Sequence, residues 1–480
     1  MSATRIPLSP YDNIMPRIYA YTIFCLPVKP EQEPRTVHKY LEEALSKTVA
    51  QMPFLAGTLV ICEPDMQDTR RGRLEILVPT LEGDRAVPLR FQDLTAILDY
   101  DDLMADGLPD DSLDGKLLLP TGLIADLGTG AAVLVAQANF LEGGCFLSVG
   151  LHHSVGDGAA AVKMMQVWAQ HCQQLQSPEI AKSPPSVSPE SLDRNILKQL
   201  WSADGNEPND RAYLEASDEL WRFLGVDPVR DASTLLNGAS SFAAPPKTET
   251  SIFYMSGPSL SKLKLAGTNS DTTGVTANDV LMAFLWRSIT RARFPPGDPI
   301  YAQDEAAILD TTFDGRANFS AACPPDYIGN VVLMNTTYLP LAFVTSSSIG
   351  LSSIASEIRS SLNTISTAQV HSAMTLAASI PDCSHLKFPF ATFAGTGLCI
   401  TSTVNMPLFE LNFGAAFDNE GKPESIRSPK SEFASICRRC VVLPRRTNGG
   451  FEILISLVEE EMERLMADDE FTQYARFCCH

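Results

Sequence analysis

The fold is decided by one stretch of the chain, which reads Gly150-Leu151-His152-His153-Ser154-Val155-Gly156-Asp157-Gly158. An apolar run precedes it and an amphipathic run follows it, so the stretch forms a strand-to-helix turn. Residues 132–140 and 145–153 are predicted to pair as a β-hairpin around a Gly-Gly turn. The stretch therefore places an imidazole at a strand end, where a general base can meet a substrate.

The two adjacent histidines are expected to point in opposite directions, because side chains alternate along a strand. His153 continues the apolar face that contains Val149 and Leu151, whereas His152 shares a face with Ser148. Partial desolvation favours the neutral imidazole, which can accept a proton. We therefore predict that His153 is a general base. A hydrogen-bonded core histidine is the alternative, and the pattern His-His-x-x-x-Asp-Gly at such a turn weighs against it.

The aspartate and the last glycine of the stretch are assigned structural roles. Residues 158–175 predict an amphipathic helix, and Asp157 is placed to cap its N-terminus. Asp157 could instead orient His153, but the short loop gives it other options, which are to cap the helix or to pair with an arginine, and the structural role is favoured. Gly158 permits close approach of a ligand because it has no Cβ atom.

Length and composition predict two α/β domains. The chain has 480 residues, of which 45% are hydrophobic, and this is too long for one ordinary core. A Pro- and Ser-rich stretch at 177–189 has the composition of a linker. We find no signal peptide and no apolar membrane span, and we interpret the 11 cysteines as reduced thiols. A soluble, cytoplasmic chain is expected.

The net charge of −20 argues against nucleic-acid binding, which needs a positive field. The segment 421–447 is a local exception, with seven basic residues against two acidic ones. One interpretation is a binding surface for a polyanionic cofactor. The other is a solvated face that balances acidic surface elsewhere, and the residues leave both open.

Several other chemistries are poorly supported by the motifs. The chain has no Gly-x-Ser-x-Gly nucleophile elbow and no phosphate-binding glycine loop between a strand and a helix. The two histidines and Asp157 lack a second ligand cluster, so no metal site is predicted. Cys437 and Cys440 form a Cys-x-x-Cys pair with no partner pair at zinc spacing, and we interpret them as ordinary strand cysteines.

Further motifs occur in order along nearly the whole chain. They are the stretch at 153–158, a Leu-Trp-Arg helix at 283–293, Phe313-Asp314-Gly315-Arg316, Tyr327-Ile328-Gly329-Asn330, Asn412-Phe413-Gly414-Ala415-Ala416 and Gly421-Lys422-Pro423-Glu424-Ser425-Ile426-Arg427. With them the chain resembles the BAHD acyltransferases, and within that family the fungal trichothecene 3-O-acetyltransferase type.

The resemblance implies an α/β fold of two chloramphenicol-acetyltransferase-like domains, with the active site in a channel between them. The domains would be residues 1–180 and 249–480, joined by a crossover linker at 181–248. The implied enzyme is a monomer with no permanently bound cofactor, and its substrates are an acyl-CoA, most simply acetyl-CoA, and a small-molecule alcohol. His153 would be the general base and Thr401 would donate to the oxyanion.

The resemblance also assigns supporting residues. Gly158 and Gly414 would shape the backbone at the site. Arg316 is expected to contact Asn412, which replaces an aspartate that pairs with an arginine in the family. Thr403 stands where many members have a tryptophan, so a wider channel is expected. The candidate contacts with CoA are Thr276, Lys262, Lys264, Lys422 and Arg427.

Three functions are open at this point. The first is an acyl-CoA-dependent O-acyltransferase, most simply an acetyltransferase for a hydroxyl of a fungal terpenoid or alkaloid, with N-acylation as a variant. The second is a freestanding condensation-type domain that takes its acyl group from a carrier protein, and the segments 412–414 and 421–427 favour the first over it. The third is a non-catalytic relative, which the presence of both His153 and Asp157 opposes.

Overall fold

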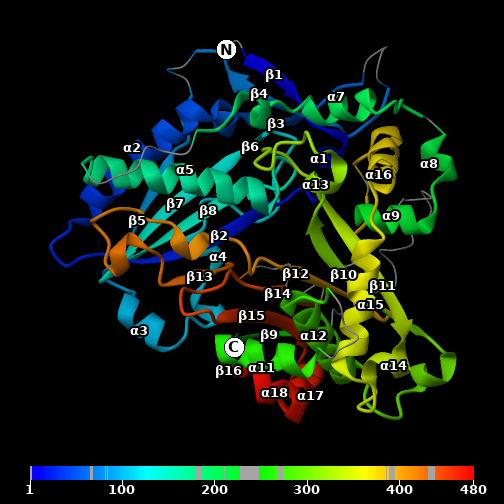
Figure 1. The fold of residues 1–480 in the computed structure, drawn as a ribbon. Coiled ribbons are helices and arrows are strands. Elements are labelled where there is room, and N and C mark those ends of the chain that lie inside the picture. Colours follow the sequence, from blue (N-terminus) through cyan, green and yellow to red (C-terminus); the bar gives the residue numbers. More distant parts are fainter. Residues whose placement is uncertain are drawn as a thin grey trace.

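Two large β-sheets with flanking helices form the body of the protein (Figure 1). The computed structural model describes residues 3–64, 69–81, 83, 85–179, 186–209, 211–227, 248–268, 274–384, 386–388, 395–430 and 438–480. Cys437 and a large part of the predicted linker, at 181–185 and 228–247, lie outside the described residues.

The first sheet has five strands in the order β13-β2-β8-β7-β5. The strands β7 (Leu134–Leu141) and β8 (Gly144–His152) pair antiparallel, which confirms the predicted hairpin. On its other side β8 pairs with β2 (Tyr19–Pro27), and β5 (Leu89–Asp93) runs parallel to β7. Every residue of β8 is buried, which explains its nearly continuous apolar sequence.

Two helices pack against each other over this sheet. They are α2 (Pro34–Gln51) and α5 (Gly158–Gln176), which begins directly after the histidine turn. Their apolar faces share one core, and the indole N–H of Trp168 in α5 donates to the carbonyl oxygen of Leu41 in α2 at 2.9 Å. The position of α5 fixes where the turn before it lies.

The second sheet has seven strands in the order β11-β10-β12-β14-β15-β9-β16. At its centre β10 (Ala306–Asp314), β12 (Gly397–Ser402) and β14 (Arg439–Val442) run parallel to one another. Helix α12 (Ala277–Arg293) is buried along most of its length in the core beside them. Since the three strands are parallel, their C-terminal ends lie at the same edge of the sheet.

One strand of the second half belongs to the first sheet. β13 (Ser425–Arg427) pairs antiparallel with β2, and Ile426 and Phe413 are buried in the core of the first sheet. The predicted domain boundary near residue 248 does not account for this strand, which lies after the boundary in sequence but belongs to the first sheet. The second half therefore reaches over the first and joins the two sheets.

The remaining strands complete the second sheet or form a small four-stranded sheet in the order β1-β4-β3-β6, and the remaining helices flank the sheets. In the described part of the crossover, α6 (Pro189–Leu192), α7 (Ile196–Ala203), α8 (Ala212–Glu215) and α9 (Asp218–Leu224) follow one another. The others are β1 (Ala3–Pro7), β3 (Thr58–Ile61), β4 (Leu74–Pro79), β6 (Ala131–Ala132), β9 (Thr248–Met255), β11 (Val332–Pro340), β15 (Phe451–Val458), β16 (Arg476–Cys479), α1 (Pro10–Asn13), α3 (Tyr100–Ala105), α4 (Gly115–Leu118), α11 (Gly257–Ala266), α13 (Arg316–Phe319), α14 (Leu341–Thr345), α15 (Leu351–Asn363), α16 (Thr367–Ser379), α17 (Glu459–Met466) and α18 (Asp469–Tyr474). Among the described helices, none combines the length and the apolar character needed to cross a bilayer.

Candidate active site

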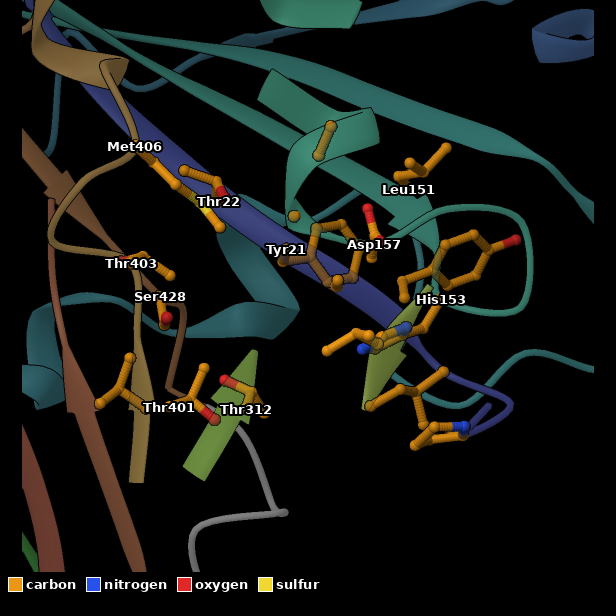
Figure 2. Close-up of a pocket in the computed structure, with 18 of the residues that line it drawn as sticks. Tyr21, Thr22, Leu151, His153, Asp157, Thr312, Thr401, Thr403, Met406 and Ser428 are labelled. Atoms are coloured by element: carbon orange, nitrogen blue, oxygen red, sulfur yellow. The ribbon is translucent and has the colours of Figure 1, made fainter. Parts of the chain in front are cut away.

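A cavity of about 470 Å³ has walls from both large sheets (Figure 2). Val149, Leu151 and His153 line it from β8 and the turn that follows. On the opposite wall, Thr312 of β10 and Thr401 of β12 come from the second sheet. The structure thus places the predicted base and the predicted oxyanion donor in one cavity, although 248 residues separate them in sequence.

The backbone of His153 is held on both sides. Its N–H donates to the carbonyl oxygen of Ile18 at 2.8 Å, and its carbonyl oxygen accepts from the side-chain amide of Asn330 at 2.9 Å. The Nδ1 atom of its ring is buried and has no hydrogen-bond partner among the described residues. No carboxylate is bound to this ring in the described part of the chain, so cavity shape and backbone contacts alone orient the imidazole.

The ring of His152 lies outside the cavity, as the strand alternation predicts. It is fully buried, its Nδ1 accepts from the backbone N–H of Ser154 at 3.2 Å, and its ring packs edge-on against Tyr19 at 5.5 Å. Burial, with the nearby His153 and Arg17, lowers the pKa of His152 to about 3. His152 is therefore a neutral core residue.

The buried His152 makes folding stability depend on pH. The unfolded chain binds a proton there below pH ~6.5, whereas the folded chain does so only near pH 3, so acid favours the unfolded state. We expect His152 to lower the free energy of unfolding by about 2 kcal/mol between pH 7 and pH 5. Urea unfolding at both pH values measures this. His152→Asn keeps an acceptor for Ser154 without a titrating ring, and its loss between the two pH values should be smaller by that amount. An equal loss in both proteins would contradict the assignment.

Asp157 has the structural role that the sequence favoured. Its Oδ1 atom accepts from the backbone N–H of Ala160 at 3.2 Å, which confirms it as the N-cap of α5. The same atom accepts from Nη2 of Arg316 at 2.9 Å, and Oδ2 accepts from the backbone N–H of Val331 at 3.0 Å. These contacts tie the histidine turn to the second half of the chain.

The predicted partner of Arg316 was wrong. The guanidinium pairs with Asp157 and with Asp314, and it also donates to the carbonyl oxygens of Tyr327 and Gly329. Burial opposes its charge, but the two carboxylates outweigh burial and raise the pKa of Arg316. The neutral amide of Asn412 offers no such charge.

Asn412 instead organises its own loop. Its Oδ1 atom accepts from the backbone N–H of Gly414 at 2.8 Å. Gly414 has φ +101°, and a Cβ atom there would lie 2.3 Å from Nε2 of Gln176. A larger residue does not fit, which supports the structural assignment of Gly414.

Gly158 lies where the two halves approach closely. A Cβ atom on it would lie 2.3 Å from the terminal methyl of Met406, a residue of the second half that also lines the cavity. Thr403, on the same segment, lines the cavity and donates to the carbonyl oxygen of Val442 at 2.8 Å. The glycine thus permits contact with a protein side chain as well as space for a ligand.

The predicted CoA contacts are mostly not at the cavity. Of the five, Arg427 alone lines it, and its buried guanidinium is paired with Glu452. Thr276 caps α12 and is bound to Asp279, and Lys422 is paired with Glu420. Lys262 lies over the ring of Tyr474 at 5.8 Å, and Lys264 is an exposed residue of α11.

Two arginines of the basic segment do line the cavity but were not singled out. They are Arg438 and Arg439, at and beside the start of β14. Arg438 is paired with Glu461 at 2.5 Å. Counting charges along the sequence identified their segment, but could not show which of them faces the cavity.

Asp12 is the main structural residue that sequence reasoning missed. It is fully buried, and its Oδ1 atom accepts from the backbone N–H of Asn330 at 2.9 Å and from its side-chain amide at 2.8 Å. Its Oδ2 atom pairs with Arg194 of the crossover at 3.3 Å. Since Asn330 also donates to the carbonyl oxygen of His153, Asp12 helps to fix the backbone of the predicted base through Asn330. The Ser9-Pro10-Tyr11-Asp12 sequence signals only the local helix cap that it also forms.

Comparison with known proteins places this site in a family. The sequence pattern described as the Transferase family matches residues 1–472. The chain belongs to this family. It is therefore an acyltransferase, as its motifs predicted, and its resemblance to the BAHD enzymes is confirmed.

Relatives within the Transferase family align over nearly the full chain. Identity is 30% over 492 residues to Eremophilane O-acetyltransferase ORF8 of Penicillium roqueforti, with 98% of both chains covered. It is 26% to Trichothecene 3-O-acetyltransferase TRI101 of Fusarium sporotrichioides, with 96% of this chain and 94% of that protein covered. The crystal structure of F. graminearum TRI101 complexed with coenzyme A and deoxynivalenol matches with a TM-score of 0.78 at 21% identity, over 99% of this chain and 100% of that one. The predicted two-half α/β fold is confirmed by this match.

Proposed function

We propose that the protein transfers an acetyl group from acetyl-CoA to a hydroxyl of a fungal secondary metabolite, most simply a terpenoid. The observation that carries this proposal is the single cavity with His153 on one wall and Thr401 on the other. The names of the relatives support it, since two of them are O-acetyltransferases of eremophilane and trichothecene compounds.

The transfer follows from the arrangement of these two residues. His153 takes the proton of the acceptor hydroxyl as the oxygen attacks the thioester carbonyl carbon. The carbonyl oxygen becomes an oxyanion, and the hydroxyl of Thr401 donates a hydrogen bond to it. When the intermediate collapses, the carbon–sulfur bond breaks and the thiolate of CoA takes the proton from His153. No acyl-enzyme forms in this scheme.

The basic end of the cavity supports CoA as the donor. Arg439 and Arg438, the latter paired with Glu461, line the cavity near β14, while the whole chain has a net charge of −20. A strongly acidic surface repels an acidic carrier protein, whereas a small anion can reach a local basic region. CoA phosphates are therefore assigned to the β14 side of the cavity.

We also propose that the enzyme acts as a cytoplasmic monomer. One chain supplies both walls of the cavity. None of the ten described cysteines forms a disulfide with another described residue, which suits a reducing compartment. The proposed domains are residues 1–180 and 249–480 with a linker at 181–248, modified by the exchange of β13.

One assay separates the candidate activities. The full chain is incubated with acetyl-CoA and a panel of hydroxylated sesquiterpenoids, release of the CoA thiol is followed, and the product is identified by mass. Acetylation of a hydroxyl is the expected result. Transfer only to amines would favour N-acylation, and transfer only from an acetylated carrier protein would favour the condensation-type function. No transfer from any of these donors would overturn the proposal.

A further inference from the structure

The strand register places a second threonine beside Thr401. In the parallel pair β10–β12, Thr311 is opposite Ile400, so the next residues along, Thr312 and Thr401, are also neighbours. Adjacent strands are about 4.8 Å apart. Figure 2 shows these two threonines side by side, across the cavity from His153.

The two threonines belong to a row of four residues across the second sheet. Thr312 is opposite Met334 in β11, and Thr401 is opposite Val441 in β14. All four residues line the cavity. The row therefore contributes to the cavity wall from four neighbouring strands, β11, β10, β12 and β14.

The two ends of this row differ in chemistry. At the β14 end lie Arg438 and Arg439, which suit the phosphates of the acyl donor. At the β11 end the cavity is lined by Met334, Leu224 and Phe388, which suit an apolar molecule. Thr312 thus lies on the acceptor side of Thr401.

The hydroxyl of Thr312 is available for a ligand. The side chain is partly exposed, and it makes no hydrogen bond to another described residue. An apolar acceptor that filled this end of the cavity would remove water from the hydroxyl and leave it unpaired, which opposes binding. An acceptor that carries an oxygen at this point avoids that penalty.

We propose that Thr312 determines acceptor specificity, because its hydroxyl hydrogen-bonds a second oxygen of the acceptor close to the hydroxyl that is acetylated. The inference rests on the proposed function, in which the acetylated oxygen lies between His153 and Thr401. An oxygen on an adjacent carbon lies ~3 Å from the reacting one, and a hydrogen bond adds a similar length. Together the two lengths reach up to ~6 Å, which is enough to span the ~4.8 Å between neighbouring strands.

Two acceptors with one skeleton test this inference. The first is a bicyclic sesquiterpenoid vicinal diol and the second is the mono-ol that lacks the neighbouring hydroxyl. Thr312→Val removes the hydroxyl at nearly constant shape. We expect it to reduce the ratio of kcat/KM for the diol to that for the mono-ol by about tenfold or more. Thr312→Ser restores the donor and should recover most of that ratio.

A matched control lies on the same strand. Thr311 is buried on the opposite face of β10, where its hydroxyl donates toward the carbonyl oxygen of Asn335 at 3.5 Å. Thr311→Val should leave the ratio unchanged. Thr401→Val should lower kcat for both acceptors, because the oxyanion forms with either.

The outcomes separate the two proposals. Equal losses on diol and mono-ol in Thr312→Val would overturn the specificity role, while acetylation by the wild type would still support the proposed function. No acetylation of either acceptor by the wild type would count against the proposed function itself. The wild type should also prefer the diol about tenfold or more, and this measurement needs no folded variant; absence of a preference would overturn the inference.

Discussion

His153→Ala lowers kcat for acetyl transfer by about 10²–10⁴-fold, the usual contribution of a positioned general base. Without the imidazole, the acceptor hydroxyl must attack with its proton still attached or lose it to water. The substitution changes no side chain at the β14 end of the cavity, where the CoA phosphates are assigned, so KM for acetyl-CoA should change little. Steady-state release of the CoA thiol at saturating acetyl-CoA measures both constants.

The neighbouring histidine provides the control for this experiment. His152→Asn changes an imidazole one residue away that does not line the cavity, and Asn can accept the same hydrogen bond from Ser154. At pH 7.5 this variant should keep most of the wild-type kcat. If His153→Ala retained the wild-type rate, or if the two variants lost activity equally, the base would be assigned incorrectly.

The two histidines show which features sequence reasoning could determine. Alternation along a single strand assigned His153 to the cavity and His152 to the core, because that property depends only on neighbouring residues. The N-cap at Asp157 is local in the same way, since its acceptor contacts Ala160 three residues later. Local rules of this kind located the strand, the turn and the helix.

The partner of Arg316 was beyond local rules. Asp157 and Arg316 are 159 residues apart, and several acidic side chains could have been proposed. The family pattern suggested position 412, where this chain has an uncharged asparagine. In the fold, the side chain of Asn412 accepts a hydrogen bond from the backbone N–H of Gly414. Arg316 pairs instead with the carboxylates of Asp157 and Asp314.

The basic segment at 421–447 shows a different limit. Charge along the sequence identified an excess of cations, but folding brings acidic residues from elsewhere to most of them. Ion pairs with carboxylates occupy Lys422, Arg427, Lys430, Arg438 and Arg446. The local charge that a phosphate meets therefore depends on long-range pairing, which a residue count does not contain.

The strand register was also inaccessible from the sequence. Thr312 is next to Thr401 only because β10 and β12 pair in parallel with one particular offset. Parallel strands are joined by long crossovers, so no turn sequence fixes that offset. Similarly, the three residues of β13 are too few to predict as a strand of the first sheet.

Arg316→Met destabilises the folded protein by about 3–5 kcal/mol, because it leaves the buried carboxylate of Asp157 without its cation. The arginine and Asp157 are 3% and 6% exposed, so water cannot replace the lost charge. The backbone carbonyl oxygens of Tyr327 and Gly329 lose a donor in the same step. Urea unfolding at pH 7 and 25 °C, followed by tryptophan fluorescence, measures the change. The second partner, Asp314, is 54% exposed, so Asp314→Asn should cost less than about 1 kcal/mol.

A double-mutant cycle separates this ion pair from simple loss of packing. In Asp157→Asn with Arg316→Met neither ion remains, so the double variant should be more stable than the sum of the two single losses predicts. Coupling is expected because removal of one partner strands a buried charge, whereas removal of both does not. Additive losses would show that the guanidinium acts through its contacts with the 327–329 carbonyl oxygens. The ion pair also matters for the position of His153. Asp157 binds the start of α5 and the backbone N–H of Val331, and the neighbouring Asn330 binds the carbonyl oxygen of His153.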